Sequence, residues 1–101
     1  MKIVGVTSCP SGVAHTYMAA EALQKAGKEK DIEVHIETQG TSGVDDELTS
    51  GQISAADFVV LSTDTSIRGT ERFKGKKVVQ LTTTQIIEKA DALMNKLSKM
   101  A

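Results

Sequence analysis

The sequence predicts an α/β protein with a single open sheet of four parallel strands, in the order 2-1-3-4, flanked by helices. Three observations support this fold class. Strand-like and helix-like segments alternate along all 101 residues. Two strand-like segments are continuous apolar runs, typical of parallel strands buried on both faces. The second strand-like segment has the pattern of an edge strand, and right-handed crossovers then give the stated order.

Composition predicts one domain, residues 1–101, with no nucleic-acid partner. Hydrophobic residues make up 40% and charged residues 25%, which is ordinary for a globular protein. The net charge of −1 and the low aromatic content of 3% argue against a nucleic-acid surface. No apolar run approaches the roughly 20 residues that span a bilayer, and the N-terminus lacks a signal-peptide pattern. The single cysteine cannot form an intramolecular disulfide, so folding needs no oxidising compartment.

The first strand is expected at about Lys2 to Thr7, and the first helix from about His15 or Thr16 to Glu29. Gly27 and the charged residues after it predict where this helix ends. Apolar residues at i, i+4 spacing predict the helix face that packs on the sheet. The predicted stripe comprises Ala14, Met18, Ala22 and Ala26, with Ala19 and Leu23 beside them.

The second strand, Ile32 to Thr38, alternates apolar residues with Glu33, His35 and Glu37. This alternation predicts one exposed face and an edge position. His35 is then a solvent-facing residue rather than a metal ligand. The following residues 39–43 are a loop by composition, and the acidic run 45–47 is interpreted as a solvated surface with no metal bound.

Two capping boxes predict the starts of the remaining helices. Thr49 with Gln52 precedes a short helix, and Thr82 with Gln85 precedes a helix that runs to about Lys99. The third strand is expected within residues 57–63 and the fourth within residues 77–81, with one possible helical turn at 70–73 and a turn at 74–76 between them. The apolar stripe of the last helix comprises Ile86, Ile87, Ala90, Leu93, Met94 and Leu97.

Cys9 lies at the turn between the first strand and the first helix. Unpaired N–H groups and the positive end of the helix dipole favour an anion there, either a thiolate or a phosphate. A lone cysteine is usually an inert buried thiol, but a helix N-terminus is a setting that lowers a thiol pKa. The predicted strand order also brings loops 39–40 and 62–64 to the same edge of the sheet. We therefore interpret Cys9 as a nucleophile that carries a phosphoryl group.

The residues after Cys9 are suited to cradle a phosphate. Gly12 lets the backbone approach an oxyanion, and Ser11 and Thr16 can add hydroxyl donors, while Pro10 fixes the chain that leaves the cysteine. The same residue types are expected in an ordinary turn that begins a helix. Only the cysteine beside them favours a phosphate-binding loop. The predicted loop comprises Pro10, Ser11, Gly12, Val13, Ala14, His15 and Thr16. No metal or other cofactor is implied.

The loop differs from that of cysteine-dependent phosphatases, whose signature is Cys-(x)5-Arg-(Ser/Thr). His15 stands six positions after Cys9, so the arginine that would clamp phosphate is absent. Pro10 is the only proline, so there is no Asp-Pro loop to supply a general acid. These differences favour phosphoryl transfer to a partner over hydrolysis.

The segment from Cys9 to Leu23, CPSGVAHTYMAAEAL, resembles the phosphorylated loop and first helix of the fructose-type enzyme IIB component of the bacterial sugar phosphotransferase system. Ser11 and Val13 stand where Thr and Ile are common in that family. The resemblance spans nearly the whole chain. It continues in Glu37-Thr38-Gln39-Gly40, Ala56-Asp57, Arg72-Phe73 and Gly75-Lys76.

The resemblance implies a protein-phosphohistidine–sugar phosphotransferase. Cys9 would take the phosphoryl group from a phosphohistidine of enzyme IIA and pass it to fructose or a related sugar held in membrane enzyme IIC. The implied location is the cytoplasm, at the inner face of the membrane through that partner. The role of His15 stays open between support of the charged thiolate, a contact to the phosphoryl group and a simple helix start.

Two other functions stay open at the level of the sequence. One is a low-molecular-weight cysteine phosphatase, and the other is an anion-binding regulatory domain whose cysteine senses redox state. The absent arginine counts against the first, and the lack of a resolving cysteine counts against the second. Asp64 is expected to be structural, because its charge would repel phosphate. Five basic residues are interpreted as a scatter of exposed charges: Arg68, Arg72, Lys74, Lys76 and Lys77.

Overall fold

The structure, a computed structural model, describes the chain apart from residues 9–12, 41–42, 65–66 and 101, and apart from the side chains of residues 13–15 and 100. The described part contains five strands in one sheet, in the order β3-β2-β1-β4-β5. The strands are β1 (Lys2–Thr7), β2 (Glu33–Gly40), β3 (Gly43–Asp45), β4 (Phe58–Ser62) and β5 (Val78–Leu81).

The predicted order of the four parallel strands is confirmed, because β2, β1, β4 and β5 are neighbours and pair in parallel. The prediction of a purely parallel, four-stranded sheet is wrong. β3 adds an antiparallel strand outside β2, with Thr38 opposite Asp45 and Gly40 opposite Gly43. Its three residues are all exposed, so no hydrophobic alternation marks them as a strand. The last part of β2 is therefore not an edge.

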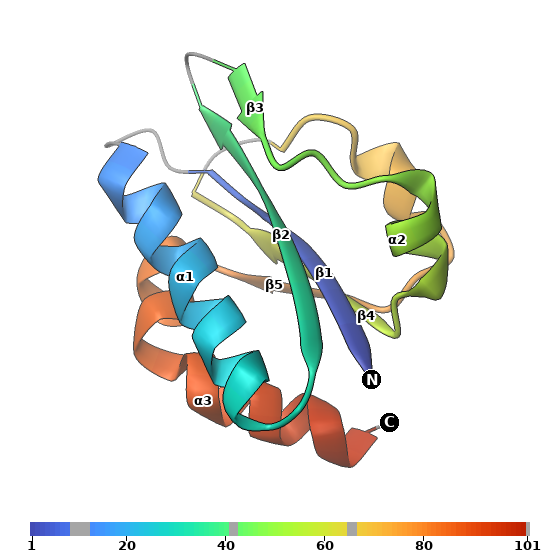
Figure 1. Cartoon of the computed structure of the whole chain (residues 1–101). Helices are drawn as coiled ribbons and strands as arrows, with labels where there is room; N and C mark the ends of the chain where they lie inside the picture. The colour runs from blue at the N-terminus through green and yellow to red at the C-terminus, as the bar shows by residue number, and fades with distance from the viewer. Residues whose placement is uncertain (9–12, 41–42, 65–66, 101) are drawn as a thin grey trace.

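The helices cover both faces of the sheet (Figure 1). α1 and α3 lie on one face, and α2 with the 3-10 helix η1 lies on the other. Their bounds are α1 (Val13–Glu29), α2 (Ser50–Ala55), η1 (Thr70–Phe73) and α3 (Thr83–Met100). Both predicted capping boxes form. Thr49 and Gln52 exchange side-chain-to-backbone hydrogen bonds, and Thr82 and Gln85 do the same.

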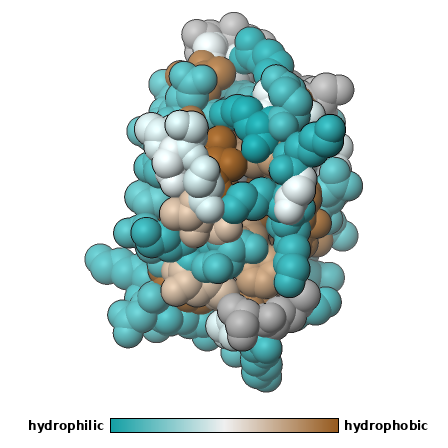
Figure 2. Space-filling view, turned by 90° about the vertical axis from the view of Figure 1, so that its right-hand side faces the viewer, coloured by the Kyte–Doolittle hydropathy of each residue, from teal (hydrophilic) through white to brown (hydrophobic). Residues whose placement is uncertain are grey.

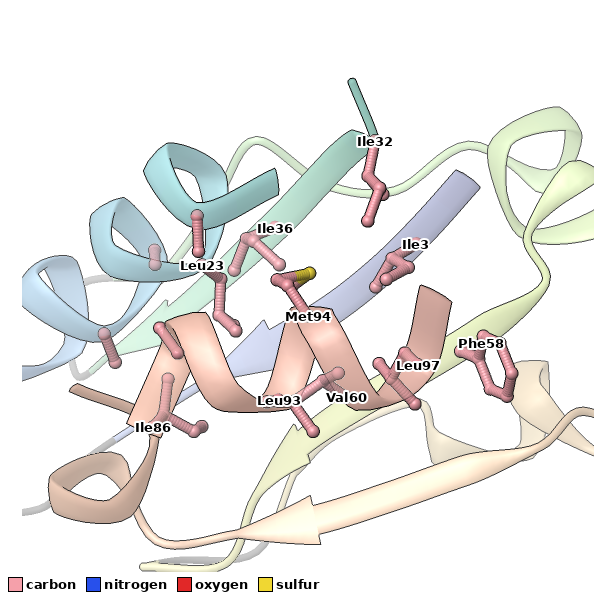
Figure 3. Close-up of a cluster of buried hydrophobic side chains, with 14 residues drawn as sticks. Ile3, Leu23, Ile32, Ile36, Phe58, Val60, Ile86, Leu93, Met94 and Leu97 are labelled. Atoms are coloured by element: carbon pink, nitrogen blue, oxygen red, sulfur yellow. The ribbon is translucent and has the colours of Figure 1, made fainter. Parts of the chain in front are cut away.

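Side chains of β1 alternate between two hydrophobic clusters, which explains why its sequence is apolar throughout. Ile3 packs in the cluster under α1 and α3, whereas Val4 and Val6 pack in the cluster under α2 and η1. Figure 3 shows the first cluster, where Met94 and Leu97 of α3 lie over the sheet. The apolar stripe predicted for α3 is confirmed, with Ile87 only partly buried.

The stripe predicted for α1 is partly wrong. Leu23 and Ala26 are buried as expected, but Met18 is 53% exposed. Ala20 is buried in addition. The helix also begins at Val13, earlier than expected. The buried face is therefore turned towards residues 19, 20, 23 and 26.

The face formed by α2 and η1 is mostly hydrophilic, with hydrophobic atoms visible in its middle (Figure 2). A shallow hollow on this side lies between the two elements. It is lined by Leu48, Ser50, Ile53, Ser54 and Arg72. Among the described helices, none is long and apolar enough to cross a membrane.

Candidate functional site

The centre of the predicted site lies outside the described residues. This applies to Cys9, Pro10, Ser11 and Gly12, and to the side chains of Val13, Ala14 and His15. The roles of Cys9 and of the residues that follow it therefore stay predictions. The structure does describe both flanks of this segment, Ser8 before it and the backbone of α1 after it.

The flanks bring two strand ends together at the carboxyl edge of the sheet. Ser62, the last residue of β4, accepts a hydrogen bond from the Ser8 backbone N–H at 2.9 Å and donates one to the Ser8 carbonyl at 3.0 Å. Both residues are buried. The two hydrogen bonds fix the backbone one residue before Cys9. The sequence predicted that the loops after the first and third parallel strands, β1 and β4, meet at this edge. The hydrogen bonds between Ser8 and Ser62 show this meeting where the two strands end.

On the other flank, α1 begins at Val13, four residues after Cys9. The first N–H groups of a helix have no partner within the helix, and the dipole makes this end positive. Thr16 is buried, and its carbonyl accepts a hydrogen bond of 3.1 Å from the Thr7 hydroxyl. This bond ties the first turns of α1 to the end of β1. The carboxyl end of β1 therefore leads towards a helix N-terminus that is suited to an anion.

Glu37 is buried at the same edge, on the opposite face of the sheet from α1. Its carboxylate accepts hydrogen bonds from both Nη atoms of Arg72 at 2.8 and 3.1 Å, from the Leu48 N–H at 3.0 Å and from Gln39 Nε2 at 2.8 Å. Burial raises the pKa of the Glu37 carboxyl, but the hydrogen bonds from Arg72, Gln39 and Leu48 outweigh it and hold the pKa below its ordinary value. Glu37 is therefore an ionised carboxylate within the protein.

The side chain of Gln39 binds the backbone of Arg68 in the manner of a neighbouring strand. Its Oε1 accepts from the Arg68 N–H at 2.8 Å, and its Nε2 donates to the Arg68 carbonyl at 2.9 Å. Arg72 adds hydrogen bonds from Nε to the Gly69 carbonyl at 2.7 Å and from Nη2 to the Arg68 carbonyl at 3.2 Å. The turn at residues 67–69 is thus held against the end of β2. We refer to Glu37, Gln39 and Arg72 as the edge clamp.

The edge clamp was missed because alternation along β2 predicted that Glu37 faces solvent. That prediction is wrong, as is the interpretation of Arg72 as a scattered exposed charge. Lys76 is also engaged, because its Nζ donates to the carbonyls of Ser54 and Ala56. The family resemblance was the one sequence signal for the edge clamp, because its matching segments include both 37–40 and 72–73.

The remaining candidate residues are structural or exposed. Asp64 accepts a hydrogen bond of 2.6 Å from the Thr83 N–H at the start of α3, as its structural interpretation predicts. His35 lies half exposed with Nε2 3.5 Å from a Glu33 carboxylate oxygen. In the acidic run, Asp45 accepts a hydrogen bond from the Tyr17 hydroxyl, and this bond raises the pKa of Tyr17. Among the described residues no His, Cys, Asp and Glu cluster could hold a metal ion.

Comparison with known proteins decides the family. Residues 4–96 match the family described as "PTS system, Lactose/Cellobiose specific IIB subunit". The chain belongs to this IIB family. It is 51% identical over 96 residues to the "PTS system fructose-like EIIB component 2" of Escherichia coli K12, covering 95% of this chain and 91% of that protein. A IIB subunit is a phosphoryl carrier of the sugar phosphotransferase system, and this is the reaction class of the chain.

Solved structures agree with this assignment. The IIB chain is similar to the solution structure of an enzyme IIB subunit from Escherichia coli K12, with a TM-score of 0.91 and 35% identity over 98% of this chain and 92% of that one. An arginine phosphatase with a TM-score of 0.55 and 15% identity shares only the fold. In the fructose-specific EIIABC component of Bacillus subtilis, which is 42% identical over 95 residues, the matched part is 15% of the whole protein.

Proposed function

We propose that Cys9 is the residue that carries the phosphoryl group in this IIB subunit. The observation that supports the proposal is its place in the chain. Cys9 follows the hydrogen-bonded Ser8 at the carboxyl end of β1, and α1 begins four residues later. A thiolate at a helix N-terminus is favoured as an anion, and so is the phosphoryl group that replaces it. Pro10 to Thr16 would then form the phosphate-binding loop.

The donor is a phosphohistidine of enzyme IIA. The Cys9 sulfur attacks phosphorus, so that an S–P bond forms while the N–P bond breaks and its electron pair returns to the imidazole. In the second step a sugar hydroxyl held by membrane enzyme IIC attacks phosphorus. An O–P bond forms, the thiolate leaves, and the hydroxyl proton passes to a base. Fused relatives named EIIBC and EIIABC, which join these components in one chain, support this choice of partners.

The sugar is fructose or a related sugar. Names of relatives with 41–51% identity refer to fructose or fructose-like systems, whereas the family description names lactose and cellobiose. We infer that the subunit works in the cytoplasm at the inner face of the membrane, where it can exchange with IIA and IIC. Phosphoryl transfer of this kind needs mainly positioning and charge stabilisation, which backbone N–H groups can supply without a metal.

The test is phosphate uptake measured by intact mass. The chain is mixed with enzyme IIA, the general phosphotransferase proteins and phosphoenolpyruvate. We expect one phosphate on the wild type, none on Cys9→Ala, and retention of the label on His15→Ala. An unlabelled wild type, or a label that persists in Cys9→Ala, would overturn the assignment. Steady turnover of an aryl phosphate without any partner would favour the phosphatase instead.

A further inference from the structure

The chain that leaves β4 is held in two places by side chains at the carboxyl edge of the sheet. At Ser62 the side chain exchanges two hydrogen bonds with the backbone of Ser8. At Arg68 the backbone exchanges two hydrogen bonds with the side chain of Gln39. Each anchor therefore fixes both a donor and an acceptor, which restrains orientation as well as distance.

The two anchors lie on opposite neighbours of β1. Ser62 ends β4, Gln39 lies near the end of β2, and β1 runs between these strands in the sheet. Ser62 and Arg68 are therefore held on opposite sides of β1 at the carboxyl edge of the sheet. The next residues after β1 are Ser8 and Cys9.

The orientation of Gln39 is itself fixed. Its Nε2 also donates to Glu37 Oε2, so both ends of the planar amide are occupied. Glu37 is held in turn by the two Nη atoms of Arg72. Gly69 fits this arrangement because its φ is +76°, and a Cβ there would lie 2.7 Å from Arg72 Nε. An ion pair with a buried carboxylate thus helps to fix where the turn at residues 67–69 lies.

We propose that Gln39, supported by the Glu37–Arg72 ion pair, is a positioning residue for phosphoryl transfer at Cys9. It holds the backbone of Arg68 in one fixed position at the carboxyl edge of the sheet, where β1 leads to the cysteine. This inference rests on the proposed function of Cys9. Release of the Arg68 backbone would leave the thiolate in place but loosen one side of its surroundings. Misplacement by about 1 Å at such a site can lower a rate about a hundredfold.

The test is the rate of phosphoryl transfer from phosphorylated enzyme IIA to the full chain in a single turnover, at several donor concentrations. In Gln39→Leu we expect the rate at saturating donor to fall about ten- to a hundredfold, while the half-saturating donor concentration stays within about twofold. Ser62→Ala, which releases the other anchor, should show the same pattern. A loss of folded protein alone would lower the amplitude of the single-turnover reaction and not its rate constant.

Two controls separate positioning from charge and from stability. Lys74→Ala removes an exposed cation that belongs to neither anchor, so its rate should equal that of the wild type. Thr49→Ala removes the cap of α2 on the same face and should lower the unfolding midpoint without slowing transfer. An equal loss of rate in Lys74→Ala or in Thr49→Ala would overturn the inference.

The outcomes also separate this inference from the proposed function. A wild type that takes up no phosphate at Cys9 overturns the proposed function and the inference together. A labelled wild type that is matched in rate by a folded Gln39→Leu overturns the inference alone. If Gln39→Leu does not fold, Gln39→Met, which keeps the length of the side chain but cannot bond the Arg68 backbone, decides the question by the same measurement.

Discussion

Glu37 is 1% exposed, although it occupies a polar position in the alternating sequence of β2. A buried carboxylate is tolerated only when its charge and its lone pairs are satisfied, and four hydrogen bonds do this here. Arg72 supplies two of them in a bidentate geometry that lysine cannot reproduce. The ion pair therefore depends on the residue type and not only on the sign of the charge.

Replacement of Arg72 by Met should destabilise the protein by about 3–5 kcal/mol, because it leaves the Glu37 carboxylate buried without its cation. Arg72→Lys should recover only part of this loss. The measurement is urea unfolding followed by circular dichroism. Lys74→Met, at an exposed neighbouring position, is the control and should change stability little. Equal stability of Arg72→Lys and the wild type would contradict the bidentate account.

Glu37 should also make stability depend on pH in the acid range. The pKa of Glu37 in the folded protein lies below its ordinary value of 4.5, so the fold favours the ionised carboxylate. This contribution is present above pH 4.5 and is lost as the pH falls through the folded pKa. The stability difference between wild type and Glu37→Gln should therefore shrink on acidification. A difference that stays constant with pH would show that the charge of Glu37 does not contribute.

At the scale of the elements, Gly27 shows how α1 approaches β2. It lies within the helix, where glycine is normally unfavourable, but a Cβ there would lie 2.3 Å from Val34 Cγ2 and 3.1 Å from the Ile32 carbonyl. The Val34 side chain is β-branched and has little freedom to move away. The glycine therefore permits close packing of α1 on β2. The sequence predicted only that the helix ends near this residue.

Two glycine substitutions should consequently have opposite effects. Gly27→Ala should destabilise by about 1–3 kcal/mol because overpacking exceeds the gain in helix propensity. Gly51→Ala in α2 should stabilise by up to about 1 kcal/mol, because the added Cβ would lie 3.9 Å from Thr49 Oγ1, an ordinary van der Waals distance. Thermal unfolding of both variants checks the signs. Stabilisation by Gly27→Ala would show that β2 moves away at little cost.

At the scale of the whole molecule, both faces of the sheet contribute to the core. The strands β1 and β4 place side chains in both hydrophobic clusters, so neither cluster can be lost without exposing the other face of the same strands. This arrangement supports the proposal that residues 1–101 form one domain. It also implies that the layers on the two faces unfold together.

Unfolding of the full chain should accordingly be two-state. The near-ultraviolet signal of Tyr17, which bonds to Asp45 of β3, should change together with the far-ultraviolet signal of the helices. The measurement is urea unfolding followed at both wavelengths. Leu97→Ala in one cluster and Ile53→Ala in the other should each lower the midpoint of both signals equally. Separate midpoints would contradict a single cooperative domain.

The sequence by itself determined the features that depend on neighbouring residues. Periodicity placed the helices and the parallel strands, two capping boxes placed helix starts, and the run of apolar residues identified β1 as central. Crossover handedness then gave the order of the parallel strands, because it follows from the chirality of the backbone. The same local pattern placed Cys9 between a strand and a helix N-terminus.

Only the tertiary structure decided the partners that are distant in sequence. Three exposed residues form β3 because β2 offers unpaired backbone groups beside them, and no pattern within the three residues predicts this. Glu37 is buried because Arg72, 35 residues away, reaches it. Alternation in the sequence indicates which face of a strand a residue occupies. Whether that face is buried depends on segments from elsewhere in the chain that pack on it. The edge clamp is therefore a property of the fold.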